Sequence, residues 1–129
     1  MKKLLLSLTF TAITLFANSQ DNAKIQAMIG GHKSNDTIQI ADFLKYTDIT
    51  TNNKEYPIVS FVMLYSDKSG DYEMMSQTNK ITDQMKNALS KMKSKDSKIK
   101  IIVFKDITVQ SSQNKRTKID DLVYKLKLE

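Results

Sequence analysis

The sequence of 129 residues contains no cysteine, no tryptophan, one proline, one histidine and three glycines. Without cysteine the chain has neither disulfide bonds nor thiolate metal ligands, so its stability must come from a hydrophobic core. The same absence argues against a bacterial lipid anchor, which is attached to a cysteine. Because no repeat, low-complexity stretch or glycine- and proline-rich linker interrupts residues 20–129, we expect them to form a single β-rich domain.

Arginine is also nearly absent, since Arg116 is the sole one, and the net charge of +6 comes almost entirely from lysine. Nucleic-acid-binding surfaces usually combine basic charge with arginine and aromatic side chains. Phe104 is the only aromatic residue near the densest group of lysines. We therefore expect no nucleic-acid partner.

The first 19 residues have the pattern of a cleavable signal peptide. Lys2 and Lys3 precede an apolar stretch over residues 4–17, and the small residues Ala17 and Ser19 suit a signal peptidase. The stretch is shorter than the ~18 residues of a membrane-spanning helix, although an uncleaved anchor is the alternative. The pattern predicts export, to the periplasm or the cell surface.

Strand patterns dominate the remaining chain. Residues 57–66 are rich in β-branched and aromatic side chains on both faces, which is typical of a central strand. A turn at 67–70 and a returning strand at 71–77 follow. Residues 98–110 and 118–128 predict two further strands joined by a turn. The first of these should face the core with Ile99, Ile101, Val103, Ile107 and Val109, with a bulge or an exposed bend at Lys105.

One helix is expected, over residues 82–95. Thr82 suits the N-cap, Asp83 complements the helix dipole in the first turn, and Met85, Leu89 and Met92 recur at helical spacing. Residues 37–46 should begin extended and end in one helical turn. The fold class predicted is mainly β: an antiparallel β-sandwich with one covering α-helix.

No combination of residues indicates catalysis, a cofactor or a metal. Gly30 and Gly31 lack the further glycines and the helix of a nucleotide-binding loop, so they predict a turn with positive φ angles. His32 has no second histidine or cysteine to complete a zinc site. Asp120 and Asp121 point to opposite faces of a strand. We expect a protein that is not an enzyme.

Two features suggest a partner-binding surface. One is the lysine cluster, which is either a solvated helix end or a contact surface; its candidate contact residues are Lys91, Lys93, Lys95 and Lys100. The other is the apolar pair Ile102 and Phe104, which lies opposite the expected core face and is either covered by the helix or exposed as an adhesive patch. The first interpretation of these residues is that they contact an envelope protein. The alternative is an anion-binding envelope protein that contacts acidic lipid or lipopolysaccharide peripherally, through the lysines.

Several short motifs resemble the C-terminal domain of the GldM family, which forms the motor stalk of the type IX secretion and gliding machinery in Bacteroidetes. The most characteristic are Gly30-Gly31 ahead of Lys33, the "VSF" at 59–61 and the "FKDI" at 104–107. The order of "IADFLKY", "TDQMKNALSKM" and "NKRTKIDDLVYKL" agrees as well. The resemblance implies a periplasmic or surface β-rich module that makes protein–protein contacts with the outer-membrane ring proteins.

The chain departs from that family in two respects. A predicted leader stands where the family has transmembrane helices and further periplasmic domains, and "SSQNKR" replaces a glycine- and proline-rich turn. We therefore expect an accessory module, not the motor itself. The resemblance implies no catalytic residues.

Overall fold

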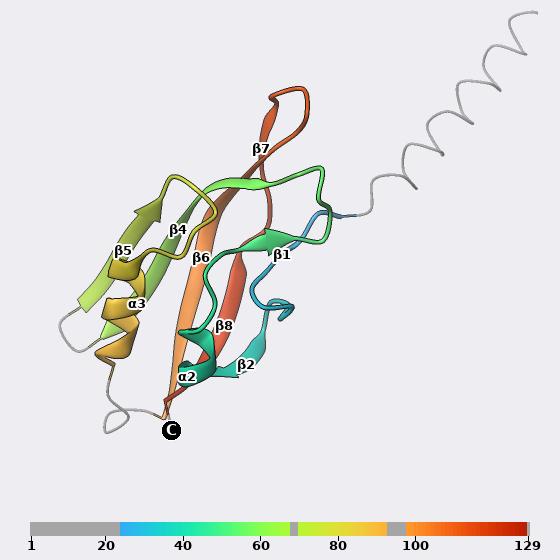
Figure 1. Cartoon of the computed structure of the whole chain (residues 1–129). Helices are drawn as coiled ribbons and strands as arrows, with labels where there is room; N and C mark the ends of the chain where they lie inside the picture. Colours follow the sequence, from blue (N-terminus) through green and yellow to red (C-terminus); the bar gives the residue numbers. More distant parts are fainter. Residues whose placement is uncertain (1–23, 68–69, 93–97, 129) are drawn as a thin grey trace, which may run out of the picture.

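A large β-sheet forms the body of the protein in the computed structural model, which describes residues 24–67, 70–92 and 98–128. The order of its strands is β2-β8-β6-β4-β5, and β7 pairs with the far end of β6 (Figure 1). The bounds are β2 (Asp36–Gln39), β4 (Ile58–Asp67), β5 (Gly70–Ser76), β6 (Ile99–Gln110), β7 (Arg116–Lys118) and β8 (Leu122–Lys127). All neighbours are antiparallel except β2 and β8, which are parallel.

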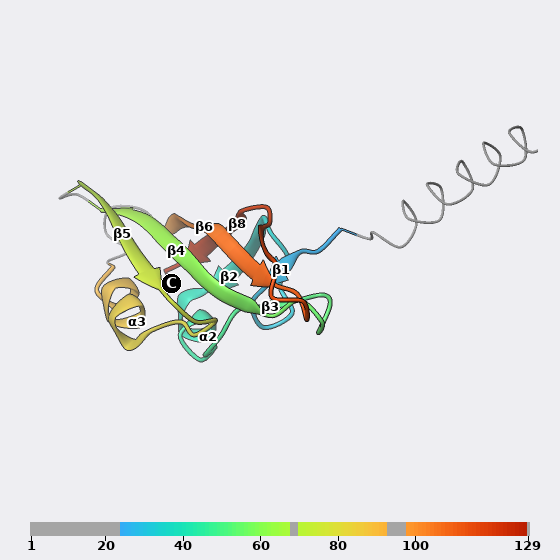
Figure 2. The same cartoon turned by 90° about the horizontal axis from the view of Figure 1, so that it is seen from above.

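The second sheet is a small antiparallel pair of β1 (Ala27–Met28) and β3 (Thr50–Thr51). Two short helices, α2 (Ile40–Phe43) and α3 (Asp83–Ser90), lie on one face of the large sheet (Figure 2). The mainly-β class with few helices, predicted from the strand patterns, is confirmed. The helical turn expected after residue 37 is α2.

The N-terminus of α3 is the one expected from the sequence. The Thr82 hydroxyl oxygen accepts a hydrogen bond from the backbone N–H of Met85 at 3.1 Å, which satisfies one of the unpaired donors of the first turn. Met85 and Leu89 are fully buried under the sheet. The helix ends at Ser90 and not at residue 95, and residues 93–97 lie outside the described part of the chain.

Aromatic rings occupy the centre of the core. Phe104 of β6 lies against Phe43 of α2, Phe61 of β4 and Tyr124 of β8, with ring centroids 5.7–6.4 Å apart. Both Phe104 and its neighbour Ile102 are fully buried. Of the two alternatives for this pair, the covered one is therefore confirmed, because both side chains lie in the core on the helix side of the sheet. The alternative of an exposed adhesive patch that binds a partner is wrong.

An irregularity in β6 explains the error. From the pair Val62 with Lys105 to the pair Ser60 with Thr108, β6 advances one residue more than β4 does. Asp106 has φ 50°, a left-handed conformation that aspartate tolerates better than most residues. The extra residue reverses the alternation, so that Ile102 and Phe104 face the core together with Ile107 and Val109. A bulge was one of the two alternatives expected at Lys105, but its effect on the strand's faces was not expected.

In the first half of β6, the side chains consequently point to the faces opposite to those predicted. Ile99, Ile101 and Val103 were predicted to point into the core. Instead, Ile99 is 47% exposed and Ile101 is 58% exposed, while Val103 is half-buried. For the last strand, the alternation of apolar and polar residues predicts that Leu122, Tyr124, Leu126 and Leu128 point inward; the first three are buried and Leu128 is half-buried.

The predicted leader, residues 1–19, lies outside the described residues. Within the described part of the chain, no helix combines the length and the apolar character needed to cross a membrane.

Neighbouring residues of β6 provide a matched test of the reversed faces. We expect Ile102→Ala to lower the free energy of unfolding by about 2–5 kcal/mol, because it leaves a cavity in the core. We expect Ile101→Ala to change it by less than about 0.5 kcal/mol, because this side chain is largely exposed. Urea denaturation of both variants measures the difference. Equal losses, or a larger loss for Ile101→Ala, would contradict the assignment of faces.

Candidate functional site

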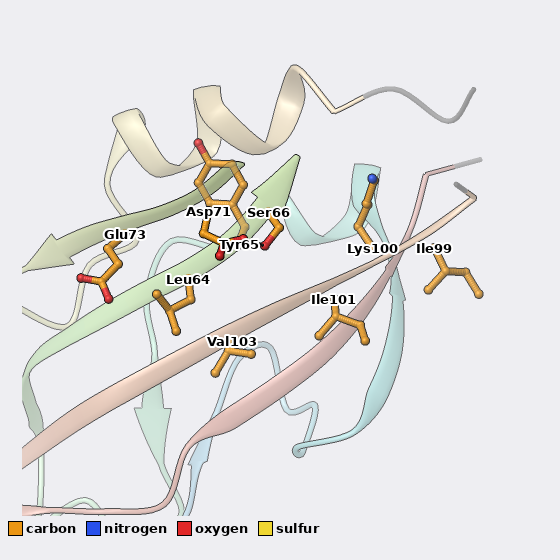
Figure 3. A pocket seen from close by; sticks show the side chains of 9 residues that line it. All are labelled: Leu64, Tyr65, Ser66, Asp71, Glu73, Ile99, Lys100, Ile101 and Val103. Atoms are coloured by element: carbon orange, nitrogen blue, oxygen red, sulfur yellow. Dashed lines mark hydrogen bonds between the residues drawn. The ribbon is translucent and has the colours of Figure 1, made fainter. Parts of the chain in front are cut away.

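The face of the large sheet that points away from the helices carries a shallow apolar groove. Leu64, Val103, Ile101 and Ile99 point to this side, whereas Tyr65 and Lys100 point toward the helices (Figure 3). The groove has a volume of about 680 Å³. We call this surface, formed by the outward residues of β5, β4, β6 and β8, the outer face. Its groove is lined by Leu64, Tyr65, Ser66, Asp71, Glu73, Ile99, Lys100, Ile101 and Val103.

Strand register places the apolar residues of the outer face next to one another. Leu64 of β4 pairs with Val103 of β6, which in turn pairs with Val123 of β8. On its other side, Leu64 pairs with Glu73 of β5. Two residues farther along β5, Met75 pairs with Val62 and is 65% exposed. An apolar stripe therefore crosses the strands in the middle of the face, with no described helix over it.

Charged side chains border this stripe, and the two borders differ in sign. Asp71 and Glu73 lie on the edge strand β5, whereas Lys125 and Lys127 point outward from β8. Asp71 accepts a 2.5 Å hydrogen bond from the Ser66 hydroxyl. The acidic border thus lies on one side of the apolar stripe and a basic border on the other.

One ion pair bridges β4 on the outer face. The Lys105 ammonium donates to Glu73 Oε1 at 3.0 Å, and this hydrogen bond raises the pKa of Lys105. The side chains reach each other across β4, between Val62 and Leu64, because Lys105 pairs with Val62 and Glu73 with Leu64. Val62, which pairs with Lys105 in the sheet, is only 8% exposed.

The structure describes two of the four lysines of the candidate cluster, and neither projects from the outer face. Lys91 is the C-cap of α3, and Lys100 extends toward the helix side of the sheet. Lys93 and Lys95 lie outside the described residues. Ile99, Ile101 and Val103 of the outer face were missed as candidates because they were assigned to the core. The signal that could have identified them was the bulge at Lys105, once its reversal of the strand's faces is taken into account.

Gly30 and Gly31 form a turn with positive φ angles, as the sequence predicted. Hydrogen bonds attach this turn to the large sheet. Gly30 and Gly31 have φ values of 57° and 80°. The backbone N–H of Ile29 donates to the Tyr124 hydroxyl at 2.9 Å, and that hydroxyl donates to the His32 carbonyl at 2.5 Å. The turn is thereby tied to β8, and the burial of Tyr124 raises its pKa above the usual value near 10.

The His32 ring also attaches the turn to its neighbours. Its Nδ1 lies 2.7 Å from Asp36 Oδ2, and its Nε2 lies 3.2 Å from the Tyr46 hydroxyl. Asp36 begins β2, so the ring connects the turn to the edge strand and to the segment after α2. Within the described ranges, histidine and acidic side chains form no group of three or more that could hold a metal ion.

The two glycines of the turn differ in the space around them, which permits a matched test. A Cβ on Gly30 would lie 2.3 Å from the Tyr46 ring, whereas a Cβ on Gly31 would have no neighbour within 4 Å. Gly31→Ala should cost only the left-handed backbone, about 1–2 kcal/mol. Gly30→Ala should cost about 2 kcal/mol more, since Tyr46 must also move. Equal unfolding free energies for the two variants in urea would refute this reading of the turn.

Comparison with known protein families and with curated proteins finds no match to this chain. The outer face must therefore be interpreted from its own chemistry.

Proposed function

We propose that this protein is an exported, non-enzymatic protein–protein interaction or scaffold module whose contact surface is the outer face. The observation that supports the proposal is the apolar surface of this face, on which Ile101 of the central strand β6 and Met75 of the edge strand β5 are both more than half exposed. Contiguous apolar surface of this kind, bordered by polar residues, is typical of protein interaction sites.

The form of the groove favours a protein partner over a small molecule. The apolar side chains stand on a broad, twisted sheet, and the groove is shallow (Figure 3). Small-molecule sites are usually deep enough to bury most of the ligand. Three polar side chains at the groove are also engaged, since Ser66 donates to Asp71 and Glu73 accepts from Lys105. They border the apolar surface and do not converge on one point above it.

The place of action in this proposal comes from the sequence. The signal-peptide pattern of residues 1–19 favours the periplasm or the cell surface. The motif likeness to the GldM family favours a role as an accessory of the type IX secretion and gliding machinery, with an envelope protein as partner. This assignment predicts that a secretion or gliding component is recovered with the chain from cell envelopes. If no secretion or gliding component is recovered, with the chain tagged at either end, the assignment to this machinery is wrong.

Photo-crosslinking in cells tests the contact surface itself. A photoreactive amino acid replaces Ile101 in the full chain, and a control chain carries it at Lys115, which is exposed in the turn between β6 and β7. We expect covalent adducts with an envelope protein from position 101 and few from position 115, because only the first lies on the outer face. No adduct at position 101, or equal adducts at both positions, would contradict the proposal.

A further inference from the structure

We propose that the outer face binds a second copy of this chain, so that two large sheets pack face to face around a two-fold axis parallel to the strands. The inference rests on the proposed function, because it names a partner of the same surface. It is derived from the distribution of charge across the face and from the register of the strands.

The strand register arranges charge in a row across the sheet. Asp71 of β5 pairs with Ser66 of β4, and Ile101 of β6 pairs with Lys125 of β8. The register between β4 and β6 pairs Tyr65 with Ile102, and its continuation by one residue sets Ser66 beside Ile101. One row therefore runs from an acid through a hydroxyl and an apolar side chain to a base. The Lys125 side chain has no ion-pair partner among the described residues.

A two-fold axis parallel to the strands makes this row complementary to itself. The axis reverses the order of the strands in the second copy, so β5 of each copy lies over β8 of the other. Asp71 then faces Lys125 of the second copy, and symmetry repeats the ion pair. β5 and β8 are three strands apart in the sheet, so the axis passes midway, between β4 and β6.

The same axis brings the apolar stripes together. β4 of each copy lies over β6 of the other, so Leu64 faces Val103 of the second copy, and Ile101 packs beside them. Sheets that pack in this way lie about 10 Å apart and interdigitate the side chains of their facing surfaces. The arrangement removes the exposed surface of Ile101 from water, which supplies the driving force for association.

The opposite orientation is disfavoured by charge. A two-fold axis in the plane of the interface but perpendicular to the strands would place β5 over β5. Asp71 and Glu73 would then face the same acids of the second copy, which costs free energy through like-charge contact. The charge pattern thus selects one of the two face-to-face arrangements.

A charge swap tests the arrangement in the purified full chain. Sedimentation equilibrium should show a dimer, and D71K or K125D alone should raise the dissociation constant by about tenfold or more, because each places like charges together twice. The double variant D71K/K125D should restore dimerisation, since the ion pair is rebuilt with reversed signs. Both positions are exposed, so the substitutions leave the fold intact.

Matched controls change the same charges elsewhere. Glu55→Lys and Lys115→Asp lie in exposed segments outside the outer face and should leave the dissociation constant within about twofold of the original. A chain that stays monomeric at about 1 mM, single reversals without effect, or a double variant that fails to dimerise would each overturn the inference.

The outcome can be separated from that of the proposed function. If the purified chain is monomeric while position 101 crosslinks to another envelope protein, this inference fails and the proposed function stands. If the chain forms the predicted dimer and the adduct at position 101 consists of two copies of this chain, both stand. If position 101 gives no adduct in cells, the proposed function fails whatever the state of the purified chain.

Discussion

The extra residue at Asp106 in β6 determines which side chains of this strand point into the core: Ile102 and Phe104, and not Ile101 and Val103. β6 lies between β4 and β8, so its facing governs the packing of the whole sheet. With the bulge in place, Phe104 lies among Phe43, Phe61 and Tyr124, and the helices cover that side. Without it, Phe104 and Val109 could not both point into the core, because strand side chains alternate. The open outer face is the other consequence of the same residue.

Local signals in the sequence predict most elements of this fold because they depend on few neighbours. Thr82 caps α3 through a hydrogen bond three residues away, and Gly30 turns the chain by its own φ angle. The alternation in β8 is continuous, so its inward residues follow directly from the pattern. The single parallel pair, β2 with β8, joins residues almost ninety positions apart and has no local signal.

The outer face was harder to predict, for a physical reason. Ile99 and Ile101 are as apolar as core residues, and a strand alone does not show on which side the helices will pack. Only the phase shift at Lys105 and Asp106 separates the two possibilities. The lysine-rich stretch, in contrast, was predicted to bind a partner because of its composition. The structure places Lys91 at the end of α3 and directs Lys100 toward the helix side of the sheet, away from the apolar stripe. Charge on the outer face depends instead on register, which sets Asp71 and Lys125 in one row.

The lack of native cysteine allows the facing of β6 to be measured directly with single-cysteine variants. The measurement is the rate at which a thiol reagent modifies I101C and I102C in dilute solution, relative to the unfolded chain. We expect the I101C thiol to react at a rate near that of the unfolded chain and the I102C thiol to be strongly protected. Protection of I101C together with rapid modification of I102C would contradict it.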